Sequence, residues 1–199
     1  MIVVESIYIY ILEIGKIMNE RGIWTTREEI ATHQFDESIA VTISKMFPVI
    51  RTVADIGCGN GDYTKYLNST KIKCSGYDGS PLTEEITSGE CYIMDFSVPV
   101  VIGTFDLVLC LEVGEHIPAQ YEKVFIDNIC NAARKLIILS WAVPGQGGTG
   151  HVNCHDNEYI IYKISRRGFG FYPELTKRLR RDATLSWFKD TLMAFRWKI

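Results

Sequence analysis

The feature that most constrains the fold of this chain is a glycine-rich turn at residues 55–61, with the sequence DIGCGNG. An apolar, strand-like run precedes the turn, and a helix is expected to begin at Asp62. The glycines at positions 57, 59 and 61 remove Cβ atoms where the backbone must bend sharply and a ligand must come close. A helix N-terminus offers free N–H groups to a carboxylate-bearing ligand. The turn therefore predicts a ligand site between a strand and a helix.

The spacing of these glycines, and the acid before them, narrow the class of ligand. In the dinucleotide fingerprint G-x-G-x-x-G the third glycine would come one residue later than Gly61. Asp55, two residues ahead of Gly57, would repel a pyrophosphate. The same carboxylate suits a ligand that carries an amino group and a sulfonium.

From residue 51 onward, strand-like and helix-like segments alternate. Strands are expected at 52–56, 72–77, 91–94, 105–111 and 136–141, and helices at 62–68, 119–134 and 157–166. Residues 168–199 would supply the last helix and strands, with 191–197 alternating as an antiparallel edge strand. This alternation predicts an α/β fold, in which a mostly parallel sheet carries helices on both faces. Ligands of such sheets bind beyond the carboxyl ends of the strands, at the switch point.

The first fifty residues are expected to be mainly helical. Apolar residues at helical spacing predict a helix over 7–18, Thr26 opens a second helix as part of a capping box, and Asp36 caps a third. This segment either covers the ligand cleft as a lid or packs under the sheet. We expect one domain over 1–199, with a helical N-terminal segment or lid at 1–49 and the α/β core at 50–199.

Charge is distributed unevenly along the 199 residues. Residues 1–159 hold 11 Lys/Arg against 21 Asp/Glu, and residues 160–199 hold 10 against 3. An acidic body argues against a broad nucleic-acid surface, while the basic C-terminal part leaves a local one open. We favour the interpretation that the basic part is a solvated helix face.

The cysteines and the apolar runs bear on the compartment. Six cysteines stand 16 to 24 residues apart with no C-x-x-C pair, which excludes a zinc ribbon and fits free thiols in a reducing compartment. No signal peptide is recognisable, and the apolar runs 7–14 and 98–113 are interrupted by acidic residues or proline. We therefore expect a soluble, cytoplasmic protein without membrane insertion.

Acidic residues recur at the ends of successive predicted strands. Asp78 ends the second strand, where an acceptor-only carboxylate can engage two ribose hydroxyls. Asp95 ends the third strand, where an adenine amino group would donate to it, and Glu112 ends the fourth. Any one of them could be an ordinary turn residue, but three on one rim favour a binding site. Asp106 is interpreted as capping the start of its strand.

Taken together, D-x-G-x-G-x-G at 55–61, GYDGSP at 76–81, Asp95-Phe96 and the segment FDLV…EVGEHIP at 105–118 resemble the ordered motifs of class I S-adenosylmethionine-dependent methyltransferases. The resemblance covers roughly residues 50–145. It implies a Rossmann-like, seven-stranded, mostly parallel sheet and methyl transfer from S-adenosyl-L-methionine, which leaves S-adenosyl-L-homocysteine. The cofactor-binding residues that it implies are Asp55, Gly57, Cys58, Gly59, Gly61, Asp78, Gly79, Asp95, Phe96 and Glu112.

Two histidines are candidate catalytic residues. His116 lies four residues beyond Glu112, and a neutral imidazole can take a proton from an attacking hydroxyl. The alternative for His116 is a structural role in the loop before Pro118. His151 follows a loop with four glycines in six residues and is the second candidate base.

Residues after the fifth strand are expected to face the acceptor. The loop at 144–153 is rich in glycine and hydrogen-bonding groups, and ordering such a loop costs entropy. The predicted acceptor-binding residues are Trp141, Gln146, His151, Asn153 and His155. His151, His155 and Asp156 could bind a transition metal, but we assign no metal ligand from the sequence.

The acceptor loop is similar to that of a methyltransferase branch found in phages, large DNA viruses and polysaccharide-modifying gene sets. This resemblance implies O-methylation of a sugar hydroxyl of a glycan, such as the deoxysugar rhamnose, in the host cytoplasm if the protein is viral. The alternatives are a nucleic-acid (RNA) methyltransferase that uses Arg178, Arg180 and Arg181 on phosphates, a small-metabolite methyltransferase, and a non-catalytic module. No motif for holding a flipped base is present, which makes a nucleic-acid acceptor the weaker reading.

Overall fold

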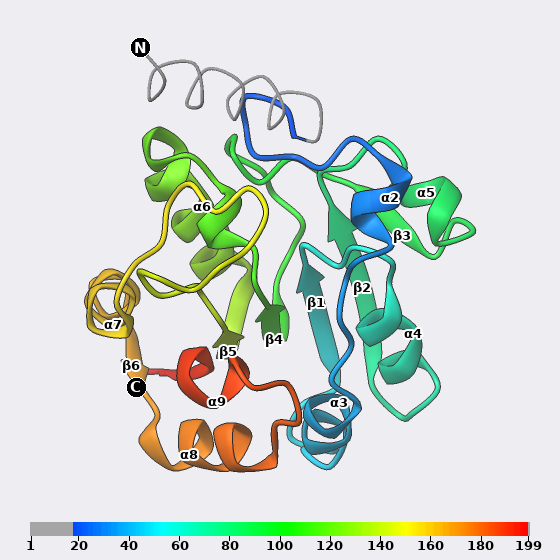
Figure 1. Cartoon of the computed structure of the whole chain (residues 1–199). Coiled ribbons are helices and arrows are strands. Elements are labelled where there is room, and N and C mark those ends of the chain that lie inside the picture. The colour runs from blue at the N-terminus through cyan, green and yellow to red at the C-terminus, as the bar shows by residue number, and fades with distance from the viewer. Residues whose placement is uncertain (1–17, 199) are drawn as a thin grey trace.

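A computed structural model describes residues 18–198 of the chain. Seven strands form one sheet in the order β3-β2-β1-β4-β5-β7-β6, with β1 to β5 parallel and β7 antiparallel to both neighbours (Figure 1). The predicted fold class is confirmed. The strands are β1 (Thr52–Ile56), β2 (Lys73–Asp78), β3 (Cys91–Ile93), β4 (Phe105–Cys110), β5 (Ala133–Leu139), β6 (Phe169–Phe171) and β7 (Met193–Trp197).

The helices follow the predicted alternation with small shifts at their ends. The largest shift is at the α6–β5 junction, because Ala133 already has extended backbone angles and starts the strand three residues early. The described helices are α2 (Arg27–Ile30), α3 (Glu37–Ser44), α4 (Asp62–Asn68), α5 (Thr83–Ile86), the 3₁₀ turn η1 (Gly114–His116), α6 (Ala119–Ala132), α7 (Asn157–Ser165), α8 (Pro173–Asp182) and α9 (Phe188–Thr191).

The placement of the last strand at an edge of the sheet is wrong. β7 lies between β5 and β6, and the three-residue β6 forms the edge. Met193 and Phe195 are fully buried on β7, and the rings of Phe169 and Trp197 lie 5.0 Å apart across the β6–β7 pair. A run as short as Phe169–Phe171 carries no periodic signal, so the sequence pattern did not reveal the covering strand.

Alternate residues of the central strands serve two separate cores. Ala54 and Val108 face the core that α6 and α7 cover, while Val53 and Leu107 face the core under α3, α4 and α8. All four side chains are fully buried. Burial on both faces explains why these strands are nearly continuous apolar runs, and it fixes the strand ends that carry the site.

The two described helices of the N-terminal segment begin where their caps predict. The Thr26 hydroxyl accepts a hydrogen bond from Glu29 N, and the Asp36 carboxylate accepts one from Ser38 N. Asp36 is fully buried, and its second oxygen accepts hydrogen bonds from the N–H groups of Thr184 and Leu185. Asp36 thereby ties α3 to the chain after α8, under the sheet. The helix predicted over 7–18 lies outside the described residues.

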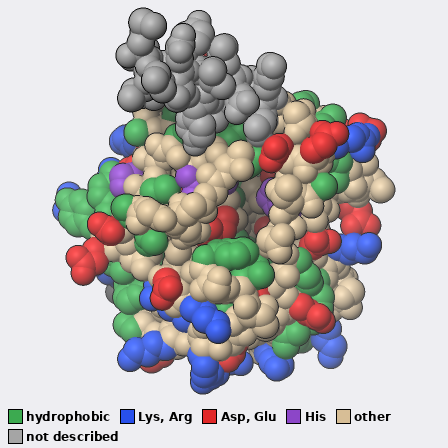
Figure 2. Space-filling model, in the orientation of Figure 1, with side chains coloured by type: hydrophobic (Ala, Val, Ile, Leu, Met, Phe, Trp, Pro, Cys, Tyr) green, Lys and Arg blue, Asp and Glu red, His purple; other side chains and the backbone are tan. Residues whose placement is uncertain are grey.

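The basic residues of α8 are engaged locally. Arg178 and Arg181 form ion pairs with Asp182, and Arg180 donates to the carbonyl of Leu192. Lys and Arg side chains gather along the lower margin of the molecule in Figure 2, where Figure 1 places α8. The basic C-terminal part is thus a helix face below the sheet.

Within residues 18–198, no helix has the length and apolar character needed to cross a bilayer. The six cysteines are all unpaired, and five of them are buried.

Candidate active site

The turn after β1 has the backbone that its glycines predict. Gly57, Gly59 and Gly61 have φ angles of 73°, 54° and 80°, in the left-handed region that glycine adopts without strain. The Asp78 carboxylate accepts a hydrogen bond from Gly59 N at 2.9 Å and another from Ser80 N at 2.9 Å. Asp78 therefore holds the turn after β1 against the end of β2, at the carboxyl edge of the sheet.

Asp55 lies beneath this turn with only 3% of its surface exposed. Thr64 of α4 donates a hydrogen bond to its carboxylate at 2.8 Å. Burial raises the pKa of Asp55 to about 7; the Thr64 hydrogen bond opposes the rise, and the Asp78 charge adds to it. The carboxyl group therefore changes charge close to neutral pH, within reach of the ligand site.

The predicted adenosine-binding residues come together beside the turn. Asp78, Gly79, Asp95 and Phe96 line a small cavity of about 50 Å³ at the ends of β2 and β3. Glu112 and Gly57 line the same cavity and connect it to a larger cleft. These residues lie at the ends of four different strands, so the sheet has gathered residues that are far apart in the sequence.

The N-terminal segment covers this side of the site. A Cβ atom on Gly79 would meet Ile23, and one on Gly59 would overlap the His33 ring. Arg21 pairs with Asp95 at 3.4 Å. Sequence reasoning did not identify these three side chains, because they lie before and after the short helix α2 in segments without any periodic pattern. Arg21, Ile23 and His33 thus lie against the site, while α3 packs under the sheet.

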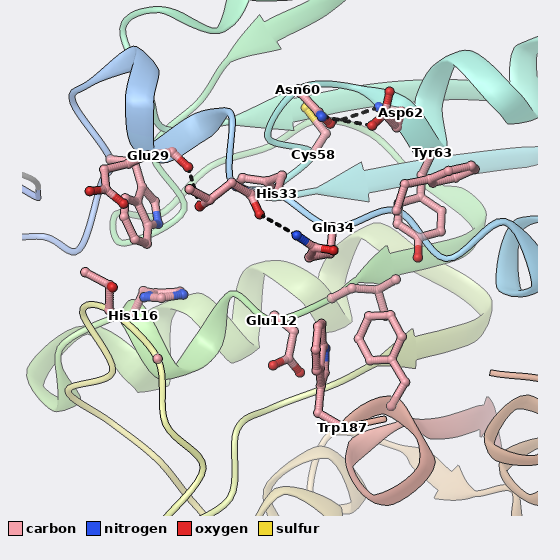
Figure 3. Close-up of a pocket in the computed structure, with 18 of the residues that line it drawn as sticks. Glu29, His33, Gln34, Cys58, Asn60, Asp62, Tyr63, Glu112, His116 and Trp187 are labelled. Atoms are coloured by element: carbon pink, nitrogen blue, oxygen red, sulfur yellow. Dashed lines mark hydrogen bonds between the residues drawn. The ribbon is translucent and has the colours of Figure 1, made fainter. Parts of the chain in front are cut away.

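The larger cleft has a volume of about 300 Å³. Figure 2 shows it as a hollow in the middle of the molecule, and Figure 3 shows His33 and Gln34 on one side of it and Glu112, His116 and Trp187 on the other. The glycine-rich loop at 144–153, which we call the rim loop, contributes residues 146–149 to a further part of the edge of the cleft. The cleft begins at the Gly57–Gly61 turn and therefore offers a ligand there a second space for a reaction partner.

Glu112 joins the two cavities and has a strained backbone. Its φ of 53° is unusual for a residue with a side chain and costs roughly 1–2 kcal/mol. Its carboxylate accepts hydrogen bonds from Gln146 Nε2 at 2.7 Å and from the Thr191 hydroxyl at 3.5 Å. The strain therefore aims the carboxylate into the cleft, where it fixes Gln146 of the rim loop.

The two candidate catalytic histidines meet at the far end of the cleft. Their ring centroids lie 5.0 Å apart, and both side chains line the cleft. Nδ1 of His116 lies 3.1 Å from the carbonyl oxygen of Gly150. Burial, followed by the proximity of His151, lowers the pKa of His116 to about 4, so its imidazole is neutral at pH 7.

Glu115 is a buried acid at this end of the cleft that sequence reasoning passed over. It is fully buried next to His116, and burial, together with the Glu112 charge, raises the pKa of Glu115 well above its usual range. Within EVGEHIP it reads as an exposed loop residue. Only the packing of the 3₁₀ turn η1 turns it inward.

Three predicted acceptor residues do not line the cleft. Trp141 is 1% exposed, lies against Gly114 and donates its indole N–H to the carbonyl of Asn153 at 2.7 Å. The side chains of Asn153 and His155 bind the Glu122 carboxylate of α6 at 3.2 and 2.8 Å. The buried carboxylate of Glu122 therefore binds two side chains that were predicted from the sequence to face the acceptor. Gln146 and His151 do line the cleft.

Comparisons with known proteins agree with the fold and match the central part of the chain. Residues 54–135 match the family described as a methyltransferase domain. Magnesium protoporphyrin IX methyltransferase from Synechocystis has a similar structure, with a TM-score of 0.62, 18% identity and 81% of each chain covered. The described residues therefore have the class I methyltransferase fold, and residues 54–135 are similar to a methyltransferase domain.

Two further proteins add to the comparison. An amino pentose methyltransferase from Micromonospora echinaspora matches with a TM-score of 0.64 and 12% identity, covering 86% of this chain and 94% of that one. A rice (Oryza sativa subsp. japonica) protein named "Probable tocopherol O-methyltransferase, chloroplastic" is 31% identical over 107 residues, which are 46% of this chain. The matched part is only 29% of the rice protein's length.

Proposed function

We propose that this protein is an S-adenosylmethionine-dependent methyltransferase that O-methylates a sugar hydroxyl of a glycan. The observation that carries the proposal is the arrangement of two adjoining cavities that share Gly57 and Glu112: Asp78 and Asp95 line the smaller one, and Asp55 and two histidine side chains line the larger cleft. The smaller cavity would receive the adenosine part of the cofactor, and the larger cleft its methionine part and the acceptor.

The cofactor's parts would be bound by separate groups of the site. The Gly57–Gly61 turn would cradle the methionine part, with Asp55 close to its amino group. Asp78 would accept hydrogen bonds from the ribose hydroxyls, and Asp95 one from the adenine amino group. Arg21 now pairs with Asp95 and would give way as adenine binds.

Two observations support a sugar as the acceptor, and the resemblance of one loop supports a hydroxyl in particular. The cleft offers hydrogen-bonding groups from Glu112, Gln146 and Thr149 as well as from the two histidines. Two neighbours of the same fold act on sugars by name, the amino pentose methyltransferase and a sugar N-methyltransferase from Streptoalloteichus. The rim loop also resembles that of glycan methyltransferases of phages and large DNA viruses.

The reaction would be an in-line displacement. The acceptor oxygen forms a bond to the methyl carbon while the carbon–sulfur bond breaks and its electron pair goes to sulfur. Most of the acceleration would come from holding oxygen, carbon and sulfur in line. The hydroxyl proton must leave as the bond forms, and the neutral imidazole of His116 or the ring of His151, both of which line the cleft, would accept it.

The direct test is calorimetric titration with S-adenosylmethionine, followed by a methyl-transfer assay on glycans that carry deoxysugars. We expect micromolar cofactor binding and transfer to a sugar oxygen. Binding with transfer only to RNA or to small metabolites would overturn the glycan acceptor. An absence of binding would overturn the whole assignment.

Cofactor binding should depend on pH through Asp55. Because the pKa of this carboxyl is raised to about 7 in the free protein, Asp55 is largely protonated at pH 6. The cationic amino group of the cofactor favours the carboxylate, so binding below pH 7 must release the proton. We therefore expect the affinity to be roughly tenfold weaker at pH 6.0 than at pH 7.5.

Calorimetry in two buffers of different ionisation enthalpy measures this proton release directly. In Asp55→Asn, which cannot ionise, the affinity should be weaker throughout and nearly independent of pH over the same range. If the wild-type protein bound the cofactor equally well at both pH values, the ionisation of Asp55 would make no contribution to cofactor binding.

A further inference from the structure

Three side chains that can bind a metal meet at the acceptor end of the cleft. They are Glu115 and His116 of η1 and His151 of the rim loop. One ligand atom from each lies within 4.8 Å of the other two, and Nε2 of His151 lies 4.0 Å from Oε1 of Glu115. The sequence suggested a different set of possible metal ligands, His151, His155 and Asp156, which shares only His151 with this cluster. In the structure His155 is bound to Glu122 instead.

The buried polar atoms of this cluster lack partners. Glu115 is fully buried, and neither of its carboxylate oxygens makes a hydrogen bond of ordinary geometry, although the N–H groups of Glu115 itself and Ala142 and the side chain of Glu112 lie nearby. Nδ1 of His151 is also buried without a partner. Among the described residues, Glu115 has a single ion-pair contact, with His151 at 4.0 Å. A buried polar group left unpaired costs about 1–3 kcal/mol, and the nearby Glu112 carboxylate repels Glu115 when Glu115 is ionised. A bound cation would offset both costs.

The hydrogen bond of His116 prepares its ring to act as a ligand. Nδ1 faces the carbonyl oxygen of Gly150 at 3.1 Å, so this nitrogen carries the proton and donates it. The other nitrogen, Nε2, then presents a lone pair. Histidines that bind metals are commonly fixed by such a hydrogen bond from the second ring nitrogen to a carbonyl or carboxylate.

We propose that Glu115, His116 and His151 bind one divalent transition-metal ion. Two imidazoles and one carboxylate suit zinc, cobalt, manganese or iron, whereas magnesium prefers oxygen ligands. Donor atoms about 2 Å from one tetrahedral ion lie roughly 3.3 Å apart. Small rotations about the side-chain bonds would bring the three groups to that spacing. Three protein ligands leave at least one coordination position open toward the cleft.

The open position would hold an acceptor oxygen, a role that rests on the proposed function. A hydroxyl bound to the ion loses its proton more readily, because the ion stabilises the alkoxide. That proton would pass to water as the oxygen takes the methyl group and the carbon–sulfur bond breaks. The two imidazoles would then act through the ion and would not take the proton themselves.

The test uses the full chain, stripped with a chelator and dialysed, with neither cofactor nor acceptor present. Titration with CoCl₂ is followed by visible absorption, and titration with ZnCl₂ by calorimetry. We expect one ion per chain for each metal and weaker binding of MgCl₂. Failure of both cobalt and zinc to bind, or preference for magnesium, would overturn the proposal.

Variants assign the ion to this cluster. His151→Ala and Glu115→Gln should each weaken cobalt binding by more than about 100-fold, since loss of an outer-shell partner alone costs about 10–100-fold. His155→Ala removes an imidazole four residues further along that does not line the cleft, and should bind cobalt like the wild type. Equal binding by His151→Ala would place the ion elsewhere and contradict the assignment.

Two further readouts keep the result interpretable. Circular dichroism and thermal unfolding establish that each variant is folded, and His151, at the rim, is the position where substitution disturbs the core least. Because no cofactor enters the titration, cobalt binding without any methyl transfer would refute the proposed function and leave the metal site standing. Methyl transfer that is unaffected by the chelator would refute the catalytic role of the ion alone.

Discussion

Asp78→Ala is expected to weaken the binding of S-adenosylmethionine by at least 100-fold, which corresponds to about 2.7 kcal/mol of binding free energy. Two losses add up in this variant. The ribose hydroxyls lose their acceptor, and the Gly59 and Ser80 N–H groups lose the carboxylate that holds them. The turn then no longer keeps the backbone in position for the methionine part of the cofactor. Calorimetric titration measures the effect.

Two controls separate ribose recognition from support of the turn. Asp78→Asn keeps one acceptor oxygen in the same place, so we expect an affinity between those of the wild type and Asp78→Ala. Glu90→Ala removes an exposed carboxylate just before β3 and should bind the cofactor normally. Wild-type affinity in Asp78→Ala, measured on folded protein, would remove the main support for the cofactor assignment.

That the predicted cofactor residues lie together could be foreseen because their signals are local. Each acid lies within two residues of the end of a strand, and the glycines of the turn stand within seven residues. Parallel strands end on the same edge of the sheet, so knowing the strands was enough to bring Asp78 and Asp95 together. The observed cavity at the ends of β2 and β3 follows from that geometry.

The acceptor end could not be predicted in the same way, because long-range packing decides which side chains reach the cleft. Glu122 lies on α6 and attracts Asn153 and His155 away from the cleft. Glu115, to which no sequence motif assigns a role, is turned inward next to His116. No spacing in the sequence encodes a contact between a helix and an irregular loop about thirty positions further along the chain.

The path of the N-terminal segment could be predicted only in part from the sequence. The caps at Thr26 and Asp36 gave the starts of α2 and α3 correctly, since capping depends on neighbouring residues. The direction of the chain on either side of α2 depends on contacts of Ile23 and His33 with glycines of the core. Those contacts exist only once the sheet has formed, so a local pattern cannot report them.

Gly114→Ala is expected to lower the free energy of unfolding by about 2–3 kcal/mol, because a Cβ atom at this position would overlap the six-membered ring of Trp141. Trp141 is buried and held by its hydrogen bond to the Asn153 carbonyl, so the ring cannot swing aside. The clash should instead displace η1, which carries Glu115 and His116.

Displacement of η1 extends the effect of Gly114→Ala from stability to function. We expect methyl transfer to fall by more than about tenfold in protein that is still folded, while cofactor affinity changes little, because Asp55 and Asp78 lie on other elements. Gly147→Ala is the matched control: it lies in the rim loop, and a Cβ atom there would meet nothing within 4 Å. Chemical denaturation measures the stability of both variants. An unfolding free energy of Gly114→Ala equal to that of Gly147→Ala would mean that Trp141 does yield, and that the position of the histidines does not depend on close packing at Gly114.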